Sequence, residues 1–300
     1  MSVSALTKAP GCFRLCRLIA WAALSLVAAP GHAATFVVNT TADTADAVPG
    51  DGICADSGGA CSLRAAIQEA NALAGPDTIV LSAAIYVLSG AAGDDVALSG
   101  DLDITGDLTL TGAGTASTII DGGGVDRVLD IDPSGAGVAV TIANLTVRGG
   151  NAAGEAGGGI RNRGTLSLNN VTLATNSSGI NGGGLLNLGT LTLTNTTVSG
   201  NTASADGGGI YNGGGSSLTI TASTLSGNSA SGAGGNGGGI FNASAATATL
   251  TNVTVSGNSA NSGGGGVFNS GGTARSSTSR SATIPQPQAA ASPTSPAPRP

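Results

Sequence analysis

A six-residue motif recurs five times in the second half of the chain and constrains the fold more than any other feature. Its pattern is Gly-Gly-Gly-apolar-x-Asn, and its closing asparagines are spaced 25, 25, 30 and 27 residues apart. A period near 25 residues indicates a solenoid, because each repeat buries its apolar side only against its neighbours. The closing asparagines are Asn162, Asn187, Asn212, Asn242 and Asn269, and a second marker keeps step with them at Asn151, Asn176, Asn201, Asn228 and Asn258.

Short alternating runs such as Leu191-Thr-Leu193 lie between the markers. Alternation places the apolar residues on one face of a strand. Three such runs per repeat predict an all-β fold, a parallel β-helix over residues 76–273, in which 77–144 form roughly three less regular coils. Glycine and asparagine suit the tight corners between strands. We expect the closing asparagines to stack into a structural ladder, and because they recur with every coil, a catalytic role for them is disfavoured.

Charge and composition exclude several classes of function. The stretch from 34 to 274 has no His and no Lys, and it carries five Arg against seventeen Asp or Glu, a net charge near −12. Ser-His-Asp triads, Cys-His dyads, His-ligated zinc and lysine Schiff bases are therefore excluded. A surface this acidic is also expected to avoid nucleic acid and anionic membranes.

The two ends of the chain differ from the repeats. Residues 1–33 have a basic start, an apolar run of about a dozen residues and small residues at the expected cleavage site, which predicts a signal peptide. The apolar run is too short to span a bilayer comfortably. We therefore expect an exported protein, secreted, periplasmic or at the cell surface, without an integral membrane segment in the mature chain. Residues 274–300 are rich in Ser, Thr, Pro, Ala and Arg. They are either a disordered linker or the product of a frameshift. The frameshift is possible because the genetic code permits a shifted reading frame in which the codons of residues 289–294 encode a further Gly-Gly-Gly-apolar-x-Asn motif.

Residues 34–75 are predicted to form a strand-plus-helix cap. Leu63, Ala66, Ile67, Ala70 and Leu73 share one helical face, Ser62 stands at the N-cap position and Gly75 follows the C-terminus. The box Cys61-Ser-Leu-Arg-Ala-Ala-Ile67, followed by Glu69-Ala-Asn71, resembles the CSLREA domain of exported bacterial proteins, except that Ala65 stands where that family has Glu. The downstream repeats are similar to the right-handed β-helix of pectin-lyase-like and polymorphic outer-membrane proteins. The resemblance, over about 34–270, implies an exported right-handed β-helix whose activity is mostly unassigned.

Cys54 and Cys61 are the only cysteines after the predicted signal peptide. In an exported chain, a local disulfide that ties the acidic loop to the helix start is the favoured interpretation. A free redox pair or a pair of metal thiolates is the alternative.

Nine aspartates lie between 94 and 132. Strand alternation places Asp101 and Asp103 on one outward side, and stacked coils can bring such carboxylates together. Asp101, Asp103 and Asp107 are thus weak candidates for a Ca²⁺ site. The favoured alternative is a solvated acidic face that needs no cofactor.

Two further groups are candidates for binding. Arg148, Glu155, Arg161 and Arg163 form the one basic cluster between residues 34 and 274. Its arginines either act on an acidic sugar, by abstracting a proton from it or clamping it, or, as we favour, pair with Glu155 and keep the surface soluble. Tyr211, Phe241 and Phe268 occupy one slot in consecutive coils, preceded by Leu186 and Arg161. Facing outward, they form a surface for sugars or another protein; facing inward, they are core.

These features favour a non-enzymatic, exported adhesion or scaffold module, with carbohydrate or a cell-surface protein as its partner and no catalytic residues assigned. The alternative is a carbohydrate-active enzyme, a polysaccharide lyase or hydrolase, on the same fold.

Overall fold

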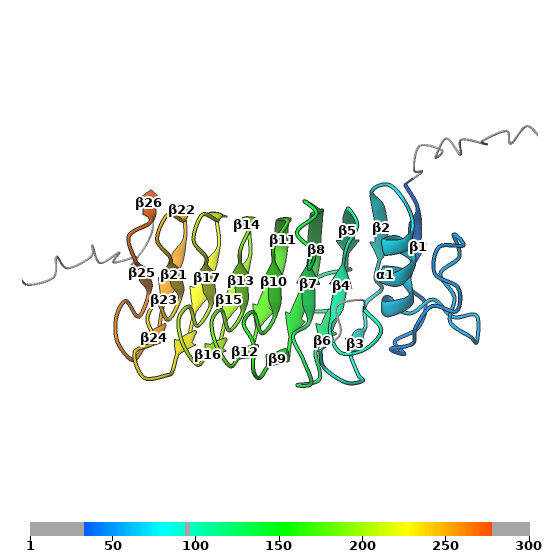
Figure 1. Ribbon diagram of the computed structural model, residues 1–300, viewed down its shortest axis with the longest axis horizontal. Helices are drawn as coiled ribbons and strands as arrows, with labels where there is room; N and C mark the ends of the chain where they lie inside the picture. The colour runs from blue at the N-terminus through cyan, green and yellow to red at the C-terminus, as the bar shows by residue number, and fades with distance from the viewer. Residues whose placement is uncertain (1–32, 94–96, 278–300) are drawn as a thin grey trace, which may run out of the picture.

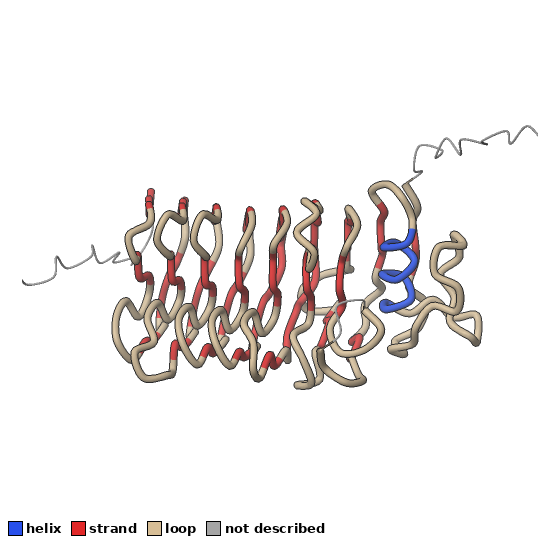
Figure 2. Tube along the Cα trace, in the orientation of Figure 1, coloured by secondary structure: helices blue, strands red, loops and turns tan. Residues whose placement is uncertain are grey.

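The computed structural model describes residues 33–93 and 97–277, which form an elongated stack of coils with a cap at its N-terminal end (Figure 1). All paired strands run parallel, in three sheets, and the single helix of the described part, α1 (Leu63–Ala72), lies in the cap (Figure 2). The predicted parallel β-helix with a strand-plus-helix cap is confirmed. The predicted signal peptide, apart from its last residue, and residues 278–300 of the tail lie outside the described residues.

Sheet A is the largest of the three and has fourteen strands. Its main path begins in the cap and continues past residue 273, where we expected the solenoid to end, as far as Ser277. The path is β1 (Thr35–Val37), β2 (Asp77–Val80), β5 (Leu108–Thr111), β8 (Ala139–Arg148), β11 (Thr165–Ala174), β14 (Thr190–Thr194), β18 (Ser217–Thr221), β22 (Thr247–Thr251) and β26 (Thr273–Ser277), and its branches are β3 (Ile85–Val87), β6 (Ile119–Asp121), β15 (Thr197–Ser199), β19 (Thr224–Ser226) and β23 (Thr254–Ser256).

Sheets B and C complete the coils. Sheet B has seven strands, one for each coil, and the short strands of sheet C follow the second asparagine marker. Sheet B comprises β4 (Leu102–Ile104), β7 (Leu129–Ile131), β10 (Ile160–Asn162), β13 (Leu185–Asn187), β17 (Ile210–Asn212), β21 (Ile240–Asn242) and β25 (Val267–Asn269). Sheet C comprises β9 (Asn151–Ala152), β12 (Ser177–Ser178), β16 (Thr202–Ala203), β20 (Ser229–Ala230) and β24 (Ser259–Ala260).

The core is a continuous aliphatic column, because the inward position of each strand repeats one coil later. Leu166, Leu191 and Leu218 are adjacent in register and fully buried. Burial of such side chains is worth roughly 1.5–3 kcal/mol each. Apolar stacking between coils therefore drives folding of the solenoid, and ladders of asparagine side chains hold the coils in register.

The closing asparagines form the predicted ladder inside the solenoid. Each side-chain amide donates to the amide oxygen one coil further on, at 2.8, 2.8, 2.7 and 2.8 Å from Asn162 to Asn269. A second ladder joins Asn176, Asn201, Asn228 and Asn258. Asn151 lies outside that ladder, because the strand register places it beside Ser177. Gly150 therefore lies next to Asn176 and donates its N–H to the Asn176 side-chain oxygen. Buried amides thus satisfy one another at two corners of the coil.

Loss of one rung has a defined cost. Asn212→Ala is expected to lower the free energy of unfolding by about 2–3 kcal/mol, because it leaves the buried Asn242 amide oxygen without its donor and opens a cavity. Urea unfolding measures this loss. Asn261→Ala, at an exposed position, is the control, and equal losses in the two variants would contradict a structural ladder.

The cap is held by the polar residues of its helix. The Ser62 hydroxyl accepts from the Ala65 N–H at 3.0 Å, as expected of an N-cap. Fully buried Glu69 accepts from the N–H groups of Gly50 and Gly52. Gln68 bonds the Asp46 N–H and the Ala97 carbonyl, and Asn71 bonds the Asp103 carbonyl and the Thr105 N–H. The helix therefore anchors the acidic loop on one side and the first coil on the other.

The predicted disulfide between Cys54 and Cys61 is present, with the Cα atoms 5.1 Å apart. It closes a short loop that leads into the N-terminus of α1.

Removal of this disulfide is expected to destabilise the cap. Cys54→Ser with Cys61→Ser should cost roughly 2–3 kcal/mol, since the cross-link restricts a short loop in the unfolded chain. Thermal unfolding of the double variant, beside the wild type with and without reductant, measures this cost. If reductant lowers the melting temperature of the double variant as much as that of the wild type, the disulfide is not the cause.

Candidate functional site

The outer face of sheet B brings the predicted candidates onto one line. Residues on either side of the middle position point into the core, so the middle residue of each strand points outward. In register along the sheet, these residues are Asp103, Asp130, Arg161, Leu186, Tyr211, Phe241 and Phe268. We call this line the outer column. It begins with charged side chains and ends with aromatic ones.

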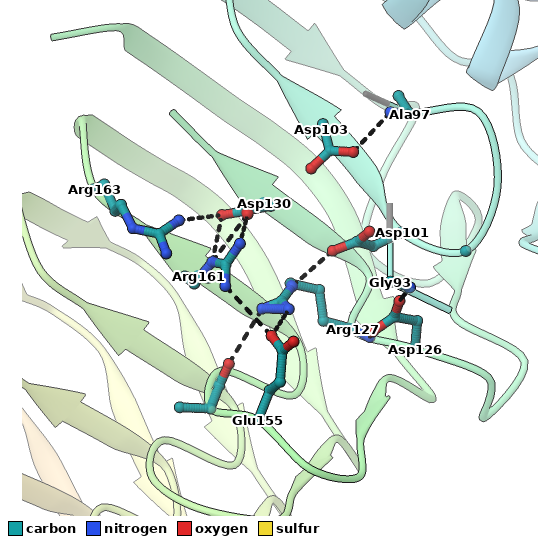
Figure 3. Close-up of polar contacts among 12 residues, drawn as sticks. Gly93, Ala97, Asp101, Asp103, Asp126, Arg127, Asp130, Glu155, Arg161 and Arg163 are labelled. Atoms are coloured by element: carbon teal, nitrogen blue, oxygen red, sulfur yellow. Dashed lines mark hydrogen bonds and ion pairs between the residues drawn. The ribbon is translucent and has the colours of Figure 1, made fainter. Parts of the chain in front are cut away.

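At its charged end the outer column belongs to a cluster of carboxylates and guanidinium groups. We call it the charge cluster: Asp101, Asp103, Asp126, Arg127, Asp130, Glu155, Arg161 and Arg163 (Figure 3). The Arg127 Nε donates to Asp101 Oδ2 at 2.6 Å, and its other nitrogens reach Glu155 and the Ala156 carbonyl. The Arg161 Nε lies 2.9 Å from both Asp130 oxygens. Each guanidinium in the cluster thus contacts a carboxylate.

Four of the five carboxylates in the cluster are buried, although the side chains of the outer column point away from the core. Asp101 is 2% exposed, and Asp103 and Asp130 are fully buried. The segment that leads into β4 covers them, and the Ala97 N–H donates to Asp103 at 2.7 Å. Arg64 of the cap holds this segment through the carbonyls of Ala97, Gly100 and Asp101. The cap and the charge cluster are therefore one connected structure.

Electrostatics in the cluster are set by this burial. Desolvation raises the pKa of Asp101 to about 8; the Arg127 charge opposes the rise, and Asp103, Asp126 and Asp130 add to it. Asp101 Oδ1 is buried and has no hydrogen-bond partner among the described residues. A carboxylate in this position favours either a proton or a cation.

The structure brings some of the predicted acidic and basic residues together and places others elsewhere on the rod. Asp101 and Asp103 meet Asp130, whereas Asp107 is exposed and accepts from the Ala139 N–H next to sheet A. Arg161 contacts Glu155, as the pairing interpretation expects, whereas the contacts of Arg161 and Arg163 with Asp130 were not predicted. Arg148 instead pairs with Asp121 on sheet A at 2.8 Å. Arg127 was not among the predicted candidates, and Asp130 was predicted only as one of the nine aspartates, not as a ligand; their sequence signal is a position about one coil after Asp101 and Asp103.

The aromatic end of the outer column faces outward but is packed against itself. Tyr211 and Phe241 stack with ring centroids 5.0 Å apart, and Phe241 and Phe268 with centroids 5.5 Å apart. Phe241 is only 7% exposed, and burial, with a smaller contribution from Asp206, raises the pKa of Tyr211. Because the faces of Phe241 are occupied by its neighbours and Leu186 is only 8% exposed, the accessible part of this end consists of the partly exposed rings of Tyr211 and Phe268.

A shallow hollow lies between the charge cluster and sheet C. It has a volume of about 240 Å³, and Asp126, Glu155 and backbone of Asn151 to Gly154 line it. Glu155 is the exposed member of the cluster, with 54% of its side chain accessible.

Comparisons of the chain with protein-family models, curated proteins and solved structures found no match. Within residues 33–93 and 97–277, no helix is long and apolar enough to cross a membrane.

Proposed function

We propose that the protein is an exported, non-enzymatic β-helix that acts as an adhesion or scaffold module at the cell surface or outside the cell. Its resemblance to CSLREA-type exported proteins and the disulfide-closed cap support this proposal. The observation that carries it is the outer column, whose charged side chains pair with one another and whose rings stack on one another. Such a surface is rigid and pre-organised for binding, while its buried carboxylates are poorly placed to reach a substrate.

The partner that fits this surface is a carbohydrate chain or a cell-surface protein. It would run along the rod and contact the partly exposed rings of Tyr211 and Phe268. The stretch from 34 to 274 carries a net charge near −12, which repels anionic polymers. This arrangement favours a neutral or cationic partner over the acidic polysaccharide of the enzymatic alternative.

The enzymatic alternative is favoured by one feature, the hollow lined by Asp126 and Glu155. Two carboxylates beside a bound sugar are the usual machinery of a glycoside hydrolase. In this chain Glu155 is held by Arg127 and Arg161, and Asp126 accepts from the N–H groups of Gly93 and Arg127. Both carboxylates are therefore held by groups of the chain itself and are not directed at a substrate in the hollow.

One pair of assays separates the two functions. The secreted full-length chain is incubated with neutral polysaccharides, polygalacturonate and intact cells, and both co-sedimentation and release of sugar are measured. We expect co-sedimentation that falls in Tyr211→Ser with Phe268→Ser and no release of sugar. Cleavage of any substrate that disappears in Glu155→Gln would instead establish the enzyme. Retention of the chain in the cytoplasm after fractionation would contradict export.

A further inference from the structure

We propose that the carboxylates of Asp101, Asp103 and Asp130 bind one Ca²⁺ ion at the junction between the cap and the solenoid. The inference goes beyond the proposed function, and it stands whether the module binds its partner or cleaves it. The site differs from the one expected from sequence, because Asp130 from the next coil takes the place of Asp107.

The geometry of the three carboxylates suits a single ion. Asp103 and Asp130 are directly opposite each other in β4 and β7, and Asp101 precedes β4. One oxygen from each carboxylate lies within 4.8 Å of the other two. Ligand oxygens lie about 2.3–2.6 Å from Ca²⁺, so one ion placed among these three oxygens can contact all of them.

The charge of the cluster also calls for a cation. Five carboxylates, those of Asp101, Asp103, Asp126, Asp130 and Glu155, face three guanidinium groups, those of Arg127, Arg161 and Arg163, which leaves a net charge of −2 when every carboxyl group is ionised. Buried charge without compensation is strongly unfavourable. One divalent cation restores neutrality without displacing any of the arginines.

A buried oxygen without a partner points to the same place. Asp101 presents one oxygen to Arg127, while Oδ1 is inaccessible to solvent and accepts no hydrogen bond from the described residues. Its residue is 2% exposed and lies beside Asp103 and Asp130 (Figure 3). A coordinated cation would satisfy this oxygen at the cost of no existing contact.

The chemistry of the donors selects Ca²⁺ among common metal ions. All three donors are hard carboxylate oxygens, and the chain after residue 33 has no His, while its two cysteines form the disulfide. Zinc and copper sites are built with the nitrogen and sulfur ligands that are missing here. Mg²⁺ requires a near-ideal octahedron and keeps most of its water, which suits a buried, three-carboxylate site less well than flexible Ca²⁺ coordination.

Calcium titration of the full-length protein tests the site. The chain is treated with a chelator and dialysed, and CaCl₂ or MgCl₂ at equal ionic strength is then added in calorimetry and thermal unfolding. We expect one Ca²⁺ per chain and a melting temperature that rises with Ca²⁺ up to the millimolar range, with a smaller response to Mg²⁺. No heat and no melting shift with 10 mM Ca²⁺, on the order of ten times the weakest affinity of extracellular calcium modules, would overturn the proposal.

Matched variants locate the ion. Asp103→Asn is expected to weaken calcium binding at least about tenfold, because it removes one charged ligand, whereas Asp107→Asn should leave it unchanged. If Asp103→Asn fails to fold, Asp101→Asn, which keeps an amide oxygen for Arg127, gives the same comparison. A Ca²⁺ response that survives in Asp101→Asn or Asp103→Asn but is lost in Asp107→Asn would also overturn this assignment.

Discussion

Replacing Arg64 by Met is expected to lower the free energy of unfolding by about 3–5 kcal/mol, the usual cost of breaking a buried ion pair from one side. Arg64 is 2% exposed, and its guanidinium contacts both oxygens of Asp43 at 2.7 and 3.0 Å. It also donates to three backbone carbonyls of the segment that covers the charge cluster. Methionine fills much of the space but removes the guanidinium from Asp43 and from the three carbonyls. Asp43 then keeps only its contacts with Ser89, and Ala97 its contact with Gln68.

Chemical unfolding followed by circular dichroism measures this effect. Arg148→Met is the matched control, because its ion pair with Asp121 is partly exposed to solvent, with 39% of the Arg148 side chain accessible. Pairs of this kind contribute about 0–1 kcal/mol. Similar losses in the two variants would show that Arg64 does not tie the cap to the first coil.

Gly208→Ala is expected to cost more than about 3 kcal/mol, or to prevent folding, because the new Cβ has no space. An ideal Cβ on Gly208 would lie 2.3 Å from the Ser229 carbonyl carbon and 2.6 Å from the Gly238 carbonyl oxygen. Both are backbone atoms of the next coil, and neither can rotate away. The two coils would have to separate, which would break the hydrogen bonds between them.

Gly154→Ala provides the control for this prediction. A Cβ on Gly154 would meet no atom within 4 Å, and its backbone φ lies outside the left-handed region. The free energy of unfolding of this variant should stay within about 0.5 kcal/mol of the wild type. A Gly208→Ala protein as stable as Gly154→Ala would mean that the coils approach one another less closely than the structure indicates.

The asparagine ladder and the aromatic ladder could be predicted because the repeats are nearly identical. When each coil has the same layout, residues one period apart become neighbours, and Asn187 and Asn212 follow directly from their spacing. The triple glycines were only partly predicted. The first glycine, such as Gly207 with φ of +70°, turns the corner as expected, whereas Gly208 is required by the close approach of the next coil.

The charge cluster could not be predicted in the same way. Between Asp103 and Asp130 the chain passes through irregular coils, so the separation of 27 residues could not be distinguished from other registers before β4 and β7 were paired. Arg127 approaches Asp101 because the segment before β4 covers sheet B, and Arg64 of the cap holds that segment. These contacts depend on tertiary structure, and hydrophobic periodicity carries no information about them.

Because equivalent residues stack in register from coil to coil, whole coils can be removed from or added to the solenoid. Residues 188–212 span one whole period, since Asn187 and Asn212 occupy the same position in adjacent coils. Deleting that segment would join Asn187 to Gly213, reproducing the junction that Asn212 already makes, and would shorten the rod by one strand spacing of about 4.8 Å. Duplication or deletion of a repeat in the gene can therefore change the distance between the cap and the C-terminal coil. Every other coil keeps the same kinds of neighbours.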